Sequence, residues 1–162
     1  MGLIGSGGRA LYIGDFFIEH TGARVVAVAD PLPDRMAALK NSLRCAGARE
    51  YTGLGGYREL VSSKLDAVVA ESPPYFHPDH VAAAVAAGRH VFLGKPVAVD
   101  VPGCHSIAES GRQAEGRLSF LVDLQTRVRP AFQEAAARLH RGDIGKPALG
   151  HVTEIRSRIP GA

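Results

Sequence analysis

Short apolar segments alternate with longer segments of helical periodicity along nearly the whole chain. The apolar segments, which we expect to be strands, cover residues 2–4, 24–29, 51–52, 65–70, 90–93 and 118–124. The expected helices cover residues 9–20, 33–46, 57–63, 77–87, 102–115 and 129–141. Strands that alternate with helices of this length form parallel βαβ units, and right-handed crossovers join such units into a doubly wound sheet. The sequence therefore predicts an α/β fold: a mostly parallel Rossmann sheet with helices on both faces.

Apolar spacing predicts which sides of the first two helices are buried. The residues that fit one face of the first helix are Leu11, Tyr12, Phe16 and Ile18. The residues that recur three and four positions apart in the second are Met36, Leu39 and Leu43. The run at 24–29 is nearly all apolar, which is typical of a strand covered by helices on both faces.

Composition and charge narrow the class of protein. Hydrophobic residues make up 46% of the chain and charged residues 22%, as is ordinary for a soluble globular protein. The net charge of +3 is scattered rather than gathered in a stripe, so no nucleic-acid partner is expected. No apolar run approaches the ~18 residues of a membrane span. The two cysteines, Cys45 and Cys104, suggest no disulfide framework, and no signal peptide precedes the first strand, so we expect a cytoplasmic protein.

The glycine-rich turn after the first expected strand has the pattern G-x-G-x-x-A. Its six residues are Gly5, Ser6, Gly7, Gly8, Arg9 and Ala10. In a dinucleotide-binding βαβ unit the first glycine allows the tight turn and the second lets the backbone approach a pyrophosphate. The small third residue allows close packing of helix against sheet. Backbone amides and the dipole at the helix start favour phosphate charge, so these residues are candidate cofactor contacts.

Asp30 ends the second expected strand, where the dinucleotide fingerprint expects an acid. Its carboxylate can accept hydrogen bonds from ribose hydroxyls and would repel a 2′-phosphate, so NAD is favoured over NADP as the cofactor. Arg35 could soften this preference, but we expect it to be a solvated helix residue. The alternative is a glycine turn with a structural role only, followed by an ordinary strand-end aspartate.

The residues after the fifth and sixth expected strands are further candidates. Ligands of open α/β sheets bind beyond the carboxyl ends of the strands. Lys95, between Gly94 and Pro96, can there hydrogen-bond a substrate hydroxyl or carbonyl; the alternative is a solvated lysine. Gln125 and Arg127 follow the sixth strand and are candidates for cofactor and substrate contact, respectively. The alternative for both is a surface loop.

The segment after the fourth expected strand breaks the chain at Ser72, Pro73 and Pro74 and opens a helix at His77. Ser72, Pro73 and His77 are placed to line the nicotinamide crevice as cofactor contacts. The alternative is that they are only the ordinary residues of a helix start. His77 and His80 stand three positions apart, but no further ligand follows at a suitable spacing, so no metal is expected.

Four segments together resemble one family in their order along the chain. They are GLIGSGGRA at 2–10, VVAVADP at 25–31, SPPYFHPDHVAAAVAAGRHVFLGKPVAVD at 72–100 and GDIGKPALGHV at 142–152. The family is that of glucose-fructose oxidoreductase, inositol dehydrogenase and MocA (Gfo/Idh/MocA). The resemblance implies an N-terminal Rossmann domain and a larger α/β domain with an open antiparallel sheet, which holds much of the substrate site.

The resemblance also implies an activity: NAD(P)-dependent oxidation or reduction of a sugar, cyclitol or related hydroxyl compound by hydride transfer. The family's Glu-Lys-Pro motif maps onto Gly94, Lys95 and Pro96, which makes Lys95 the implied catalytic and substrate-binding residue and all three residues implied cofactor contacts. The motif glutamate is replaced by Gly94. A non-catalytic nucleotide-binding or cofactor-sensing module is therefore the second interpretation, and an unrelated Rossmann protein such as a methyltransferase is the third.

The chain is expected to divide after residue 146. Residues 1–146 are assigned to the NAD(P)-binding domain, and residues 147–162, with a strand at 151–159, to the start of the substrate domain. We expect the chain to be a fragment or the product of a truncated gene. It should be inactive alone, because half of the substrate pocket belongs to the second domain. A homo-oligomer and a sugar-like substrate are expected for the full-length protein.

Overall fold

The structure is a computed structural model that describes residues 1–153. Contacts within it divide the chain into a first compact unit, Met1–Asp123, and a second one that begins at Leu124. The division predicted after residue 146 falls inside the second unit and stays a prediction.

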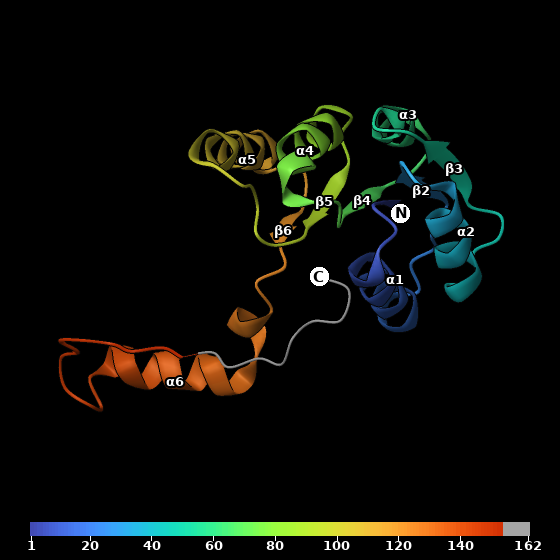
Figure 1. The fold of residues 1–162 in the computed structure, drawn as a ribbon. Helices are drawn as coiled ribbons and strands as arrows, with labels where there is room; N and C mark the ends of the chain where they lie inside the picture. Colours follow the sequence, from blue (N-terminus) through green and yellow to red (C-terminus); the bar gives the residue numbers. More distant parts are fainter. Residues whose placement is uncertain (154–162) are drawn as a thin grey trace. The chain divides into compact units, whose positions relative to one another are not determined.

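The first unit is built on a six-stranded, wholly parallel sheet. Its strands are β1 (Gly2–Ile4), β2 (Ala27–Asp30), β3 (Arg49–Thr52), β4 (Ala67–Ala70), β5 (His90–Leu93) and β6 (Phe120–Val122). Their order is β3-β2-β1-β4-β5-β6, so the strand order reverses between β1 and β4 (Figure 1). In the register of these two strands Ile4 stands beside Ala70. The predicted fold class is confirmed, and the carboxyl ends of β1 and β4 meet at the point where ligands of such sheets bind.

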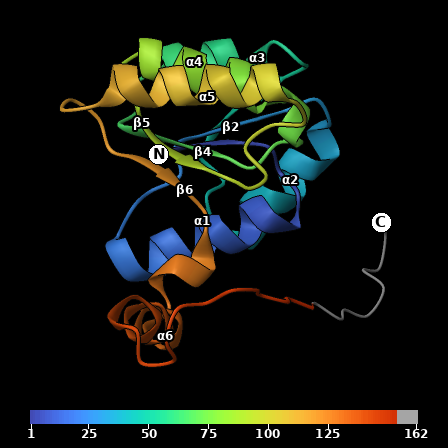
Figure 2. The same ribbon diagram turned by 90° about the vertical axis from the view of Figure 1, so that its left-hand side faces the viewer.

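Helices cover both faces of the sheet. They are α1 (Gly8–Thr21), α2 (Pro33–Ser42), α3 (Gly56–Ser62), α4 (His77–Ala86) and α5 (Val101–Ala114), with a short 3₁₀ helix, η1 (Pro74–Phe76), before α4. Figure 2 shows α3, α4 and α5 on one face and α1 and α2 on the other. Each face has its own core: Leu3, Val28 and Val69 pack toward α1 and α2, whereas their strand neighbours pack on the opposite side. This alternation follows from the two-residue period of a strand.

The buried face of α1 differs from the predicted one. Tyr12 and Phe16 are 60% and 50% exposed, and the buried residues of α1 are instead Ala10, Ile13 and Gly14. The helix lies so close to its neighbours that a Cβ atom at Gly14 would come within 2.9 Å of a Leu43 methyl carbon. Only small side chains fit such an approach, so the two aromatic rings turn outward.

Other expectations hold with shifted bounds. Met36, Leu39 and Leu43 are buried as predicted. The predicted second helix, however, ends at Ser42 rather than at residue 46, because Arg44 takes a positive φ of 54°. The predicted strands at 24–29, 65–70 and 118–124 are shorter than expected and begin at Ala27, Ala67 and Phe120, whereas the strand predicted at 51–52 begins earlier, at Arg49.

The second unit contains a 3₁₀ helix, η2 (Gln125–Val128), and the predicted helix, α6 (Pro130–Arg141). Gly142 ends α6 in a left-handed conformation with φ of 81°. Residues 151–153 form no strand, and the rest of the strand predicted at 151–159 lies outside the described residues. None of the helices in the described part of the chain is long and apolar enough to cross a membrane.

Candidate nucleotide-binding site

The glycine turn runs from the end of β1 into α1 and crosses closely over the end of β4. Gly5 has a φ of +93°, and its amide donates to the Ala29 carbonyl oxygen at 2.8 Å. A Cβ atom at Gly5 would lie 2.7 Å from the Glu71 carbonyl oxygen and 2.9 Å from the Ser72 nitrogen. Backbone conformation and lack of space therefore both require glycine at this position.

The next two glycines border open space instead. A Cβ atom at Gly7 or at Gly8 would meet nothing within 4 Å. Gly7 is the N-cap of α1, and the first amides of a helix have no acceptor within it. These amides and the positive end of the helix dipole therefore border an open space next to Gly7, an arrangement that fits a pyrophosphate group.

Asp30 ties the end of β2 to the glycine turn. Its carboxylate accepts hydrogen bonds from the Ser6 amide at 2.8 Å and from the Leu32 amide at 2.9 Å, one on each oxygen. The residue is only 9% exposed. Each carboxylate oxygen can accept a further hydrogen bond, so the side chain can still bind donors such as ribose hydroxyls.

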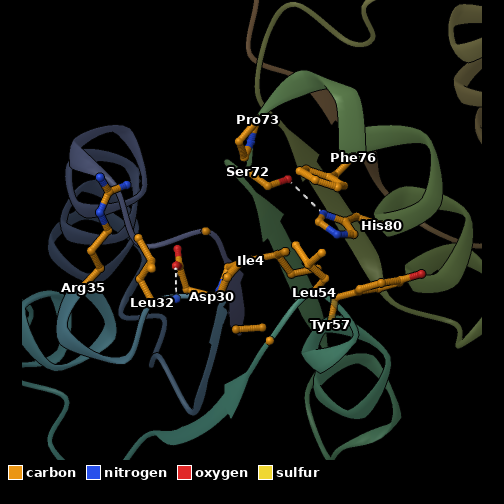
Figure 3. Close-up of a pocket in the computed structure, with 14 residues that line it drawn as sticks. Ile4, Asp30, Leu32, Arg35, Leu54, Tyr57, Ser72, Pro73, Phe76 and His80 are labelled. Atoms are coloured by element: carbon orange, nitrogen blue, oxygen red, sulfur yellow. Dashed lines mark hydrogen bonds between the residues drawn. The ribbon is translucent and has the colours of Figure 1, made fainter. Parts of the chain in front are cut away.

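A cleft of about 310 Å³ lies beyond the carboxyl ends of β1, β2 and β4. Figure 3 shows Asp30, Leu32 and Arg35 on one side of it and Ser72, Phe76 and His80 on the other. The remaining lining residues are Ile4, Gly5, Ala29, Pro31, Gly53, Leu54, Tyr57 and Pro73. Mostly apolar walls with a few polar groups are what a small-molecule site requires. The predicted residues Gly5, Asp30, Ser72 and Pro73 are thus brought together around one cleft.

His80 forms part of the cleft wall as an uncharged aromatic ring. It stacks on Phe76 with ring centroids 5.9 Å apart and lies 4.4 Å from the Tyr57 ring. Burial, with a smaller effect from His77, lowers the pKa of His80 to about 4. At neutral pH its Nδ1 atom can therefore accept the hydrogen bond from the Ser72 hydroxyl, 2.9 Å away.

The lowered pKa of His80 predicts a pH-dependent stability. The folded state resists protonation down to about pH 4, whereas an unfolded histidine binds its proton near pH 6.5. Protons therefore bind preferentially to the unfolded state as the pH falls, and stability is lost below pH 6.5. The contribution of His80 between pH 7 and pH 5 should be about 2 kcal/mol, at ~1.4 kcal/mol for each pH unit.

Urea unfolding at both pH values, on the parent chain and on a His80→Gln variant, measures this contribution. The difference between the two chains isolates His80 from Glu71, whose raised pKa works in the opposite direction. His105→Gln, at an exposed position of α5, is the matched control and should behave as the parent does. An identical pH dependence in the parent and the His80→Gln variant would contradict the assignment.

The His77 ring lies between two loops of the site, the one after β4 and the one after β5. Its Nε2 atom is 2.8 Å from the Ser72 carbonyl oxygen and its Nδ1 atom 3.1 Å from the Pro96 carbonyl oxygen. Burial lowers the pKa of His77, so the ring is neutral and donates to one carbonyl, which the shorter distance assigns to Ser72. Only 1% of the residue is exposed, so the ring packs between the two loops, and its predicted cofactor contact stays a prediction.

The segment after β5 lies at the same edge of the sheet. Gly94 is buried and donates to the Ala70 carbonyl oxygen at 2.9 Å, whereas Lys95 is exposed. The Lys95–Pro96 peptide bond is cis. Because β5 pairs with β4, Lys95 stands next to the segment that begins at Ser72, although it does not line the cleft of Figure 3.

Two acids that the sequence analysis did not single out lie at this edge. Glu71 directly follows β4, and one of its carboxyl oxygens, Oε1, is buried without a hydrogen-bond partner. Asp123 directly follows β6 and forms an ion pair with Arg9 of the glycine turn. Burial raises the pKa of Glu71 to about 7, Arg9 lowers it and Asp123 raises it. The signal for Glu71 in the sequence was an acid at the end of an otherwise apolar strand.

Gln125 and Arg127 belong to η2 of the second unit. Their predicted contacts with cofactor and substrate therefore stay predictions. Within residues 1–153, no group of three or more His, Cys, Asp and Glu side chains is arranged to hold a metal ion.

The reversed strand order, the glycine turn and the anchored acid define a dinucleotide-binding Rossmann domain. Residues 1–121 match the model of the GFO_IDH_MocA family, described as an oxidoreductase family with an NAD-binding Rossmann fold. The chain belongs to this family, as the resemblance in its sequence indicated.

Several relatives are inositol dehydrogenases. The chain is 33% identical to inositol 2-dehydrogenase 3 of Saccharopolyspora erythraea over 99% of its own length, but spans only 46% of that protein. It is 30% identical to scyllo-inositol 2-dehydrogenase (NAD(+)) of Bacillus subtilis over 78% of its length and 35% of that protein.

Solved structures with the same fold include two with a cofactor bound. The scyllo-inositol dehydrogenase of Lactobacillus casei with NAD(H) and scyllo-inositol matches with a TM-score of 0.69 and 25% identity, over 89% of this chain and 41% of that one. A 3-ketoreductase of Actinomadura kijaniata in complex with NADP matches with a TM-score of 0.70 and 25% identity, over 89% of this chain and 44% of that one.

Proposed function

We propose that this chain is the NAD(H)-binding part of an oxidoreductase that transfers hydride to or from the hydroxyl-bearing carbon of a cyclitol or related sugar. The observation that carries the proposal is Asp30, an acid that is bonded to the glycine turn and lines a cleft where the strand order reverses. A carboxylate at this position suits free ribose hydroxyls and repels a 2′-phosphate, so NADP is the less favoured cofactor.

Different residues of the site would bind different parts of a dinucleotide. The amides at the start of α1, from Gly8 through Ala10, would bind the pyrophosphate, and Asp30 would accept from the adenosine ribose. The apolar cleft walls near Leu32 and Leu54 would hold the adenine ring. The nicotinamide ring, when bound, supplies the acceptor or donor of the hydride. Ser72 and Pro73, which follow β4, would lie on the nicotinamide side of the site.

Lys95 is the proposed catalytic residue. Its ammonium group can donate a hydrogen bond to the reacting hydroxyl, orient it and exchange its proton. Its exposure at the edge of the sheet leaves it accessible to a substrate. The Gly94 amide bonds to β4, and the Pro96 carbonyl oxygen lies 3.1 Å from the buried His77 ring, so the residues on both sides of Lys95 are held in place. Arg127 and Gln125 are the further candidates for substrate and cofactor contact.

The rest of the substrate site is proposed to belong to a second domain, which begins after residue 146. The 162-residue chain should then bind nucleotide but turn over substrate poorly. Cytoplasmic location and homo-oligomeric assembly of the whole protein are part of the same proposal. One observation favours a second function, a non-catalytic cofactor-binding module: Gly94 stands where the resemblance places a motif glutamate.

Calorimetric titration of the chain with NAD⁺, NADH and NADP⁺ tests the proposal. We expect NAD(H) to bind more tightly than NADP⁺, and Asp30→Ala to weaken NAD⁺ binding at least roughly tenfold, since hydrogen bonds to a charged group contribute ~1.5–3 kcal/mol each. Asp34→Ala, four positions along the chain in the first turn of α2, is the matched control and should bind as the parent does. A folded parent chain that binds no nucleotide, or an Asp30→Ala variant with unchanged affinity, would refute the proposal.

A further inference from the structure

Glu71 occupies the space in which a side chain at position 94 would lie. A Cβ atom built on Gly94 would come within 2.5 Å of Glu71 Oε2 and 3.1 Å of Glu71 Cδ. The next neighbour, the Ala70 carbonyl oxygen, is 3.2 Å away. Gly94 has no positive φ, so its backbone would accept another residue. What excludes a side chain at position 94 is chiefly the carboxyl group of Glu71.

The backbone of Glu71 is held at the point where the strand order reverses. The Glu71 amide donates to the Ile4 carbonyl oxygen at 2.9 Å, and the Glu71 carbonyl oxygen lies directly below Gly5. The residue thus touches the pyrophosphate turn on one side and the Gly94–Lys95 segment on the other. The second half of a doubly wound sheet holds the second nucleotide of a dinucleotide, which places Glu71 on the nicotinamide side.

We propose that Glu71 supplies, from the end of β4, the carboxylate that position 94 lacks, and that this carboxylate faces the nicotinamide end of the cofactor and favours its oxidised, cationic form. The inference rests on the proposed function, because it assumes that the cleft binds NAD(H). It makes Glu71 a positioning and discriminating residue that acts through its charge, separate from the catalytic role proposed for Lys95.

The surroundings of Glu71 allow its charge to change near neutral pH. Oε1 has no hydrogen-bond partner among the described residues, so no hydrogen bond to this oxygen stabilises the charged form, and only the charge of Arg9 favours it. Burial raises the pKa of Glu71 to about 7. The charged groups that act on it are Arg9 on α1 and Asp123 after β6, which pair with each other. Lys95 follows Gly94 on the neighbouring segment and is exposed.

A cationic nicotinamide ring next to Glu71 would favour the ionised carboxylate. Binding of NAD⁺ should therefore release a proton below about pH 7, whereas binding of the uncharged ring of NADH should not. The ratio of the two affinities isolates this effect, because the adenosine half and the pyrophosphate are the same in both nucleotides. The structure thus predicts that the affinity for NAD⁺ relative to that for NADH increases as the pH rises.

The experiment measures the affinities of the 162-residue chain for NAD⁺ and NADH by calorimetry from pH 5.5 to pH 8.5. In the parent chain, the affinity for NAD⁺ relative to NADH should rise about tenfold between pH 6 and pH 8, as linkage to one proton allows. In Glu71→Gln the ratio should be constant with pH. Glu109→Gln, at an exposed position of α5, is the matched control and should keep the parent profile.

A double variant tests the shared space directly. Glu71→Ala removes the carboxyl group that blocks position 94, so adding Gly94→Glu should give a folded chain in which the pH-dependent ratio returns. Gly94→Glu alone places two carboxyl groups in one space and should unfold at lower urea concentration than the double variant.

The outcomes separate the two proposals. If the folded parent chain binds neither nucleotide, the proposed function fails. If both nucleotides bind but their ratio is constant with pH in the parent, or equally pH-dependent in Glu71→Gln, only the role of Glu71 is refuted. The parent profile decides this even if a variant does not fold.

Discussion

Gly5→Ala should lose about 3 kcal/mol of folding stability, whereas Gly7→Ala should remain folded and lose nucleotide affinity. At Gly5 a side chain would impose a φ of +93° on alanine and place Cβ 2.7 Å from the Glu71 carbonyl oxygen. Strain at such a backbone position costs ~1–3 kcal/mol, and overpacking costs a similar amount. The turn cannot move away without breaking the Gly5 bond to Ala29, and the end of β4 cannot move away without breaking the bond from the Glu71 amide to the Ile4 carbonyl oxygen.

Gly7 is the matched control at the second glycine of the same turn. Its φ is −78°, and an added Cβ would meet nothing within 4 Å, so alanine should cost less than ~1 kcal/mol, the usual effect at an N-cap. The methyl group would instead fill the open space in front of α1. We expect NAD⁺ affinity to fall at least roughly tenfold, because the second glycine lets the backbone approach the pyrophosphate.

Urea unfolding and calorimetric titration of both variants measure these two effects separately. Equal stability losses in Gly5→Ala and Gly7→Ala would show that the close crossing over β4 is not what requires glycine. Unchanged NAD⁺ affinity in a folded Gly7→Ala variant would mean that the space in front of α1 does not bind the cofactor.

His77→Ala should be the other strongly destabilising substitution, with a loss of about 3 kcal/mol or more. The change removes a buried ring, leaves a cavity and takes the hydrogen-bond donor from a buried carbonyl oxygen. His77→Phe fills the cavity but donates no hydrogen bond. It should therefore recover part of the loss and retain the cost of ~1–3 kcal/mol for an unsatisfied polar group.

His105→Ala is the control, since His105 is exposed on α5 and its loss should change stability by less than ~0.5 kcal/mol. Urea unfolding at pH 7.5 compares all three variants. A His77→Ala variant as stable as His105→Ala would show that the loops after β4 and β5 hold their positions without this ring.

The alternation of strands and helices could be predicted because it depends on local spacing of apolar residues. The same spacing wrongly predicted that Tyr12 and Phe16 lie on the buried face of α1. An apolar residue prefers burial only where the neighbouring elements leave room for it, and the approach of Leu43 to Gly14 leaves none. Which face of a helix is buried is decided by the distance to its neighbours, which periodicity alone does not contain.

The arrangement of the glycine turn and Asp30 could be predicted from the sequence, whereas the place of Glu71 beside Gly94 could not. Gly5, Gly7 and Asp30 belong to one βαβ unit, so their spacing along the chain reflects their arrangement in space. Glu71 and Gly94 end neighbouring strands that are separated along the chain by α4. Whether the carboxyl group of one fills the space beside the other depends on the register of β4 and β5.

The sequence by itself thus determined the fold class, the glycine turn and the acid that anchors it, because backbone conformation and short-range hydrogen bonds set these features. Only the tertiary structure decided three features: the His77 ring lies between the carbonyl oxygens of two loops, His80 forms an uncharged wall of the cleft, and the carboxyl group of Glu71 fills the space beside Gly94. The physical reason is that burial changes the charge and bonding of a side chain, and burial arises only when distant strands and helices pack together.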